Sequence, residues 1–405
     1  MIQKFGFSAA AIVVGLSIVG CGSQQAAPLP GSPATSAAAE SHSAASMPGS
    51  TAAGDVGMAG VITDAEKVLN VYNWSDYIVP DLLTAFEKRY GIKINYDVFD
   101  SNEVLETKLL AGKTGYDVVV PTGSFLQRQI KAGVFQKLDK SLLPNLKNVD
   151  PEMAKHFEVF DPGHEYGVNY IWLTSGVGYN VDKIKAAMPD APVDSFRMFY
   201  DPAVTKNFKD CGVTLLDAPD EIVSTVLVFL GRDPTSEKPE DLAAAEKVLT
   251  SIRPYVRYFN SSKYIEDLAN GETCLALGWG GDVGQSATRA REAKNGITIK
   301  YNIPKEGALL LFDMMAIPAD AAHPKNAHLF LNYLLSAEVA ARNASVLHYA
   351  VSNSAAYPLI DPVVYNDRGI FPSVETKAHL HPNLAHSQAY TRLLTRMWTK
   401  LKAGR

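Results

Sequence analysis

Residues 68–77 read VLNVYNWSDY, and they join a predicted buried strand to an aromatic loop that carries one carboxylate. The apolar run 68–72 predicts a short strand, and residues 80–90 after the loop predict a helix. Ligands of open α/β sheets bind where a strand passes into its loop. There the rings of Trp74 and Tyr77 offer π faces to a small cation, and Asp76 offers a counter-charge. The same residues also fit core packing for the tryptophan and a helix cap for the aspartate.

The order of strand, then helix, repeats along the chain. After the first pair, the pattern predicts strands at 92–99 and 116–120, with helices that end at Gly112 and Gly133. The later chain has the same pattern, with strands predicted at 213–216, 274–278 and 309–312 and helices at 222–230, 327–335 and 338–346. This order is typical of an α/β fold with a parallel sheet covered by helices.

Carboxylates occur at several of the predicted strand exits, namely Asp76, Glu221, Asp282 and Asp313. Asp282 follows Trp279, which repeats the pairing of tryptophan and aspartate in the first loop. A second cluster of the same chemistry favours binding over packing as the role of the first. The sequence therefore predicts a cation site at the carboxyl ends of strands.

The N-terminal residues predict export. Lys4 is followed by an apolar run at 7–19 and by Ile18-Val19-Gly20-Cys21, in the pattern of a bacterial lipobox. We expect a signal peptide at 1–20 and a lipid on Cys21, with a plain secretory signal as the alternative. Residues 21–66 are rich in Ala, Ser, Pro and Gly, which predicts a disordered tether. The membrane is then reached through the lipid alone, because no other segment is apolar enough to span it.

Charge and residue usage exclude several function classes. The chain has 405 residues and a formal net charge of −5, and its basic residues do not cluster, which argues against nucleic acid. No nucleophile stands beside a base in any known motif, so we expect no enzyme and no cofactor. Cys211 and Cys274 are an even pair in an oxidising compartment and predict a disulfide, with free buried thiols as the alternative. No metal site is expected, because neither cysteine has further ligands at metal spacing.

Several longer stretches carry a family resemblance: residues 72–78, 96–106, 133–136, 178–183, 216–219, 267–271 and 303–308. On these stretches, the chain from Leu69 to about Lys402 resembles the periplasmic polyamine-binding proteins of ABC transporters, above all the putrescine-binding branch. The resemblance implies a two-lobed periplasmic binding protein fold of type II, with a hinge and a ligand cleft between the lobes. We expect lobe 1 at 67–172 plus about 295–340, and lobe 2 at 173–294 plus about 341–405.

The resemblance also implies a role for each residue of the cleft. The walls of an aromatic box are expected from Trp74, Tyr77, Trp279 and Tyr349. Ammonium groups are expected to meet Asp76, Asp282 and Asp313, with Glu221 at the second end. Hydroxyl or backbone acceptors are expected from Ser75, Thr122 and Ser124. Cys211 and Cys274 fall where relatives pair their cysteines.

Three positions bear on ligand length. Ala218 and Ser124 stand where spermidine-preferring relatives carry a carboxylate and a tyrosine, which favours a short diamine. Leu311 stands where relatives commonly have an aromatic ring, so one wall of the box is aliphatic. The resemblance implies a monomeric lipoprotein of the periplasm that delivers putrescine or a related polyamine to an ABC transporter permease. A spermidine-preferring receptor, and a polyamine sensor that docks on a membrane signalling protein, are the alternatives; the leaflet of the anchor stays open.

Overall fold

The computed structural model describes residues 60–404, which belong to one compact unit. The predicted signal peptide, the lipidation site Cys21 and the tether up to residue 59 lie outside the described residues. Within residues 60–404, no helix is both long and apolar enough to cross a membrane.

The strands of the described chain are β1 (Val68–Trp74), β2 (Lys93–Phe99), β3 (Val118–Val119), β4 (Gly167–Asn180), β5 (Val213–Leu215), β6 (Val256–Phe259), β7 (Leu275–Trp279), β8 (Ile299–Asn302), β9 (Ala308–Ala316) and β10 (Leu380–Pro382). The α-helices are α1 (Pro80–Tyr90), α2 (Asn102–Ala111), α3 (Gly123–Lys131), α4 (Pro151–Phe157), α5 (Val181–Ala187), α6 (Arg197–Tyr200), α7 (Pro202–Thr205), α8 (Pro219–Phe229), α9 (Pro239–Ile252), α10 (Lys263–Ala269), α11 (Gly280–Glu292), α12 (Pro324–Leu334), α13 (Ala337–Leu347), α14 (Pro362–Tyr365), α15 (Val374–Lys377) and α16 (Gln388–Lys402). Short 3-10 helices are η1 (Lys140–Leu142), η2 (Pro144–Asn148), η3 (Lys206–Phe208), η4 (Arg253–Tyr255) and η5 (Tyr357–Leu359).

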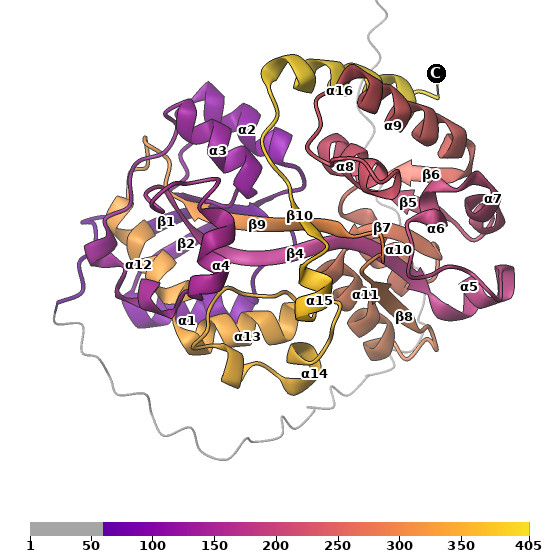
Figure 1. Ribbon diagram of the computed structural model, residues 1–405. Coiled ribbons are helices and arrows are strands. Elements are labelled where there is room, and N and C mark those ends of the chain that lie inside the picture. Colours follow the sequence, from indigo (N-terminus) through magenta and orange to yellow (C-terminus); the bar gives the residue numbers. More distant parts are fainter. Residues whose placement is uncertain (1–59, 405) are drawn as a thin grey trace, which may run out of the picture. The chain divides into compact units, whose positions relative to one another are not determined.

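The strands form a mixed sheet in the order β2-β1-β3-β9-β4-β7-β5-β6, and this corrects the prediction of a parallel sheet. β1 is parallel to β2 and β3, and β5 is parallel to β6 and β7. β4 runs antiparallel to β9 through residues 167–174 and to β7 through residues 175–179. Figure 1 shows β4 and β9 side by side through the middle of this unit. These two strands run against their parallel neighbours, so the sheet is mixed.

Helices end close to the predicted positions in the first part of the chain: α2 ends at Ala111, directly before Gly112, and α3 ends at Lys131, two residues before Gly133. α1 ends at Gly91, whose φ of 66° lies in the left-handed region that favours glycine. α2 begins after Ser101, whose side chain accepts a hydrogen bond from the backbone N–H of Val104. The loops after β1 and β2 lie at the same edge of the sheet, because the two strands are parallel and in register.

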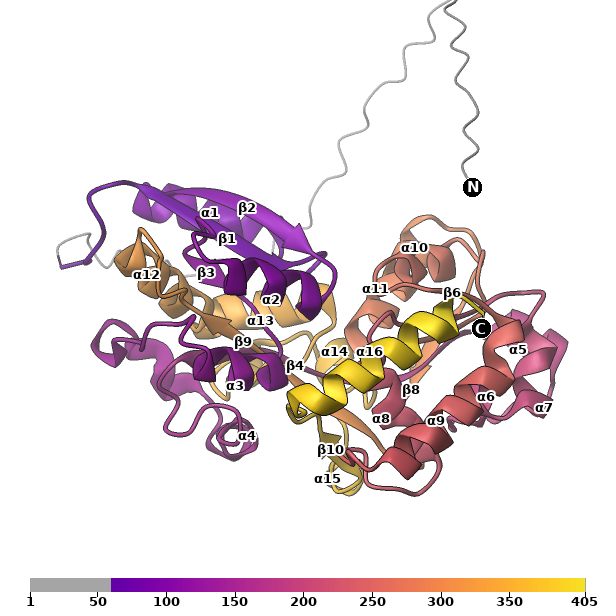
Figure 2. The ribbon, with the colours of Figure 1, turned by 90° about the horizontal axis from the view of Figure 1, so that it is seen from above.

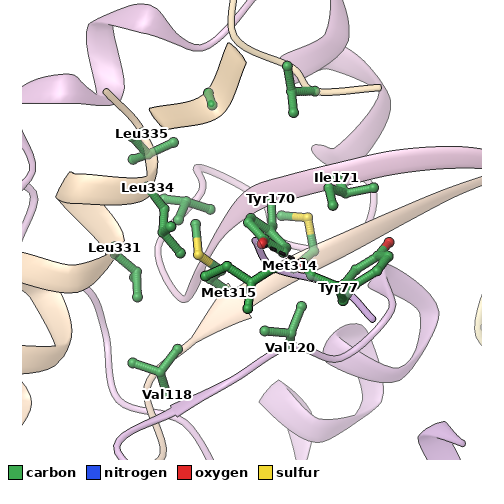
Figure 3. Packing of buried hydrophobic residues seen from close by; sticks show 14 of the residues in the cluster. Tyr77, Val118, Val120, Tyr170, Ile171, Met314, Met315, Leu331, Leu334 and Leu335 are labelled. Carbon is green, nitrogen blue, oxygen red and sulfur yellow. Dashed lines mark hydrogen bonds between the residues drawn. The ribbon is translucent and has the colours of Figure 1, made fainter. Parts of the chain in front are cut away.

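Two hydrophobic cores share this sheet. The first is built around β1, β3 and β9 with α1, α12 and α13, and the second around β5 and β7 with α8, α9 and α16. Figure 2 shows α1, α2, α3 and α12 around the first core and α5 to α9 around the second. Figure 3 shows part of the first core, where Met314 and Met315 of β9 lie beside Val118, Val120 and leucines of α12. The chain passes between the cores at residues 174–176, between 302 and 308, and between 384 and 390.

The packing differs from the predicted lobe boundaries in three segments. β8 was expected in lobe 1, but it pairs with residues 177–180 of β4 beside the second core. The chain from 341 to 371 was expected in lobe 2, but α13 packs on α12 and η5 in the first core. Residues 61–66, expected as tether, dock on α12, because Asp64 accepts hydrogen bonds of 2.9 Å from the backbone N–H groups of Lys325 and Asn326.

The predicted disulfide is confirmed. Cys211 and Cys274 are bonded, with their Cα atoms 5.5 Å apart and a sequence separation of 63. Cys274 precedes β7, the strand that leads to Trp279, so the bond ties this strand to the second core. Closing a loop of this length in the unfolded chain corresponds to about 4 kcal/mol of stability in the chain-entropy account.

Candidate functional site

A cavity lies between side chains of the two cores. Of the residues predicted for the cleft, those that line it are Trp74, Ser75, Tyr77, Thr122, Glu221, Trp279, Asp282, Leu311, Asp313 and Tyr349. Asp76 and Ser124 do not line it.

Two tryptophans that line the cavity pack against each other edge-on. Trp74, the last residue of β1, donates a hydrogen bond of 2.9 Å from Nε1 to the carbonyl oxygen of Val120. Trp279, the last residue of β7, presents its ring edge-on to Trp74, with the ring centres 5.8 Å apart and the planes at 73°. Because each tryptophan ends a strand of a different core, the two strands set the width of the cavity.

Asp313 lies inside β9 and not at a strand exit, which corrects the prediction. Its carboxylate accepts hydrogen bonds from the hydroxyl groups of Tyr77 at 2.5 Å and Thr122 at 2.6 Å. The side chain is almost fully buried, and burial raises the pKa of Asp313 to about 6. The hydrogen bonds from Thr122 and Tyr77 oppose this rise in pKa.

Asp282 lies in the first turn of α11, and this helix begins directly after Trp279. Its carboxylate accepts hydrogen bonds from the hydroxyl groups of Tyr264, at 2.7 Å, and Tyr349. Burial raises the pKa of Asp282 to about 6, against the effect of these two hydrogen bonds. The ring of Tyr349 also packs edge-on against Tyr77 at 4.9 Å between ring centres, which connects Asp282 to the residues around Asp313.

Glu221 lies in the first turn of α8, just after the short strand β5. It accepts a hydrogen bond of 2.9 Å from Nε1 of Trp279 and one of 3.2 Å from the hydroxyl of Ser175. Burial raises the pKa of Glu221 to about 8. The carboxyl group of this residue is therefore largely protonated at neutral pH while the cavity holds no cation.

These three carboxyl groups share one electrostatic property: all are buried, and each is held by neutral donors. Within residues 60–404, no Lys, Arg or His forms an ion pair with Glu221, Asp282 or Asp313. A buried carboxylate without a cation is costly, which is why the pKa of each group is raised. The arrangement favours a cationic guest, whose charge would replace the protons. The same part of the chain has no group of three His, Cys, Asp or Glu side chains arranged to hold a metal ion.

Asp76, predicted as an ammonium acceptor, has a different partner. Its backbone φ of 53° is left-handed, and its carboxylate forms an ion pair of 3.0 Å with Arg289 of α11. Gln285 of the same helix donates a hydrogen bond of 3.4 Å to the Asp76 carbonyl oxygen. Asp76 therefore joins the loop after β1 to α11, which begins beside the second core, and its negative charge is already paired.

Ser124 is a buried residue in the first turn of α3, and its hydroxyl oxygen has no hydrogen-bond partner within the described chain. Residues that the sequence analysis missed include Leu173, which lines the cavity, and Ser175 and Tyr264, which hold two of the carboxylates. β4, which carries Leu173 and Ser175, is buried on both faces and has no alternation that would have marked them. Asn102 was also missed, and its side-chain amide donates a hydrogen bond of 2.9 Å to the hydroxyl oxygen of Thr122.

The chain matches known proteins over most of its length. Residues 81–372 match the family model of the bacterial extracellular solute-binding proteins. The chain is 53% identical to the putrescine-binding periplasmic protein SpuD of Pseudomonas aeruginosa (strain UCBPP-PA14), over 88% of this chain and 97% of that protein. It is 50% identical to the putrescine-binding periplasmic protein PotF of Escherichia coli (strain K12), over 85% and 94% of the two chains.

The fold is shared with solved structures as well. A putative spermidine/putrescine ABC transporter protein from Listeria monocytogenes superposes with a TM-score of 0.75 at 30% identity, and covers 84% of this chain and 100% of its own. The α/β fold is therefore that of the type II periplasmic binding proteins, whose members in these comparisons bind solutes and are not enzymes. Sequence, cavity and fold agree, and this chain belongs to the family of bacterial extracellular solute-binding proteins.

Proposed function

We propose that this protein captures a polyamine, putrescine in the first place, in the cavity between its two cores and delivers it to an ABC permease. The observation that carries the proposal is the set of three buried carboxyl groups without a basic partner in the described chain. A diamine supplies two ammonium groups, and its methylene chain needs flat apolar walls. The identity to putrescine-binding relatives supports the same ligand class.

The site residues would divide the ligand between them. Asp282 and Asp313, which are connected through the packed rings of Tyr77 and Tyr349, would accept one ammonium group. Glu221, held by Trp279 and Ser175, would accept the other. Charge-assisted hydrogen bonds of this kind are stronger than neutral ones, and they replace the water that the ammonium groups lose.

The walls of the cavity would select the length of the amine. Trp74 and Trp279 offer aromatic faces, whereas Leu311 and Leu173 offer flexible aliphatic ones. Leu311 pairs with Leu173 across the antiparallel strands β9 and β4, so these two side chains come from one level of the sheet. An aliphatic wall leaves more room than a ring, and we infer that this side of the cavity sets the preference among short polyamines.

Each core would be the centre of one lobe, and the cavity would close when the two lobes move toward each other. The chain segments that pass between the cores are the expected hinge, and they include the middle of β4. The ion pair between Asp76 and Arg289 would form as the lobes close, because its partners belong to the loop after β1 and to α11. It is half-exposed, so its contribution is small, about 0.2–1 kcal/mol.

The proposed location of the protein and its delivery of polyamine to a permease are supported by the names of the relatives and by the N-terminal sequence. The matched relatives are periplasmic proteins by name, which supports the same compartment for this chain. A lipid on Cys21 would keep the folded unit near the membrane, and the tether would let it reach a permease as a monomer. Replacing Cys21 with alanine should release the protein from membranes into the soluble fraction; a protein that stays with the membranes would contradict the anchor.

Calorimetry with putrescine, cadaverine, spermidine, spermine and amino acids tests the binding proposal. We expect saturable binding of putrescine and none of amino acids. Asp282→Asn removes one charge at nearly constant shape and should weaken putrescine binding by at least about 30-fold, because one charge of a buried pair is left unpaired. Asp190→Asn is the matched control, since Asp190 is exposed and does not line the cavity. Absence of polyamine binding by the wild type, or equal affinities of the two variants, would contradict the proposal.

A further inference from the structure

Tyr264 of α10 contacts two elements of the site without lining the cavity. Its hydroxyl group donates to Asp282 at 2.7 Å and accepts from the backbone N–H of Trp279 at 3.0 Å. The side chain is only 1% exposed, so no solvent molecule competes for these two bonds. One hydroxyl group therefore holds both a buried carboxylate and the backbone of an aromatic wall.

β7 has a glycine, Gly278, where the ring of Tyr264 packs against it. A Cβ atom at Gly278 would lie 2.5 Å from the ring of Tyr264, which no side chain could occupy without a shift. The glycine thus lets the tyrosine ring lie directly against β7, one residue before Trp279. The indole of Trp279 in turn donates to Glu221 at 2.9 Å. A chain of hydrogen bonds consequently runs from Asp282 through Tyr264 to Trp279 and Glu221.

We propose that Tyr264 is a positioning residue, which holds the carboxylate of Asp282 and the indole of Trp279 in the geometry that binds an ammonium ligand. The inference rests on the proposed function and deepens it, because it assigns a role to a residue outside the cavity. Tyr264 touches no ligand in this account. It acts by keeping Asp282 an acceptor and by fixing the backbone from which Trp279 extends.

The charged and titratable groups around Asp282 define what the loss of this hydroxyl would do. Tyr349 also donates to the carboxylate, Asp76 raises the pKa of Asp282 through its charge, and Arg289 lowers it. Tyr77 lies beside Tyr349. With Tyr264→Phe, all these groups remain, and one hydrogen bond to the carboxylate is lost. Such a bond corresponds to about one to two units in the pKa of the acceptor.

The variant should therefore lose affinity in a pH-dependent way. With the pKa of Asp282 raised from about 6 by that amount, putrescine binding by Tyr264→Phe should be weaker than wild type by about 2- to 10-fold at pH 7. The loss should grow to about 5- to 50-fold at pH 6 and nearly vanish at pH 9, where the carboxyl group is ionised in both proteins.

The experiment measures putrescine affinity by calorimetry at pH 6, 7 and 9 for wild type, Tyr264→Phe and Tyr200→Phe. Tyr200 is the matched control, because it is also a buried tyrosine of the second core, with its hydroxyl 2.7 Å from that of Thr225 and no place in the cavity. A loss for Tyr264→Phe that grows toward low pH, with Tyr200→Phe close to wild type, is the expected result. A loss that does not vary with pH, or equal behaviour of the two variants, overturns the inference.

A second measurement keeps the inference testable if the ligand proposal fails. The carboxyl ¹³C resonance of Asp282 is titrated in the ligand-free wild type and in Tyr264→Phe, after circular dichroism has shown that both are folded. We expect the midpoint to rise by about one to two pH units in the variant. An unchanged midpoint overturns the role of Tyr264. Failure of the wild type to bind any polyamine would instead overturn the proposed function.

Discussion

Binding of a diamine should release protons, because the buried carboxyl groups of the ligand-free protein carry them. The change to test is Glu221→Gln, which removes the carboxyl group with the most strongly raised pKa in the cavity. Glutamine keeps an oxygen that can accept from Trp279 and Ser175, so the variant changes the proton inventory with little change of shape. The number of protons released then reports the state of Glu221 directly.

The magnitude follows from the pKa values. At pH 7, a group with a pKa of about 8 carries about 0.9 proton, and each group with a pKa of about 6 carries about 0.1. If Glu221, Asp282 and Asp313 are all ionised in the complex, the wild type should release about 1.1 protons per putrescine. Glu221→Gln should release only about 0.2. At pH 9 both proteins should release almost none, because the carboxyl groups are already ionised.

The assay is titration calorimetry in buffers of different ionisation enthalpy at one pH, since the slope of the observed enthalpy gives the protons released. Glu240→Gln is the matched control, because Glu240 is an exposed carboxylate in the first turn of α9, as Glu221 is in the first turn of α8. The control should behave like the wild type. Release near zero for the wild type at pH 7, or equal release by wild type and Glu221→Gln, would refute the reasoning.

Three further predictions follow from the same contacts. Burial raises the pKa of Glu221 from 4.5 to about 8, so the folded apo protein binds more protons than the unfolded chain between these pH values. The stability that this group contributes is fully present below about pH 4.5, and about 3 to 4 kcal/mol of it is lost between pH 5 and 8. Urea unfolding of wild type and Glu221→Gln from pH 5 to 8 should show that loss in their difference; a constant difference would contradict it. Arg289→Gln should weaken putrescine binding by no more than about fivefold, through faster dissociation in stopped-flow, whereas a far larger loss would place Arg289 in direct ligand contact. Leu311→Trp should change the ratio of putrescine to spermidine affinity in competition calorimetry, and an unchanged ratio would show that this wall does not select length.

Local signals in the sequence predicted much of the site. Neighbouring residues encode the aromatic loop after β1, the helix end at Gly112, and the carboxylates in the first turns of α8 and α11. These features depend on contacts within a few positions, which periodicity and capping rules describe.

Long-range contacts account for what the sequence could not predict. An apolar run followed by Asp313 resembled a strand end, but β9 continues because Tyr77 and Thr122, far away in the sequence, satisfy the buried carboxylate. The sequence predicted Asp76 as an ammonium acceptor, but in the fold its carboxylate forms an ion pair with Arg289, which is far away in the sequence. The lobe boundaries depended on which core α13 and β8 join, and no local pattern carries that information.

The most direct test of the account is a crystal structure of the protein with putrescine. The account predicts one ligand in the cavity, with one nitrogen about 3 Å from carboxylate oxygens of Asp282 and Asp313 and the other equally near Glu221. The methylene chain should lie against the rings of Trp74 and Trp279, which line the cavity. A ligand bound elsewhere, or nitrogens that meet only water and backbone carbonyl groups while the three carboxyl groups stay unengaged, would contradict the claim that buried carboxylates hold the diamine.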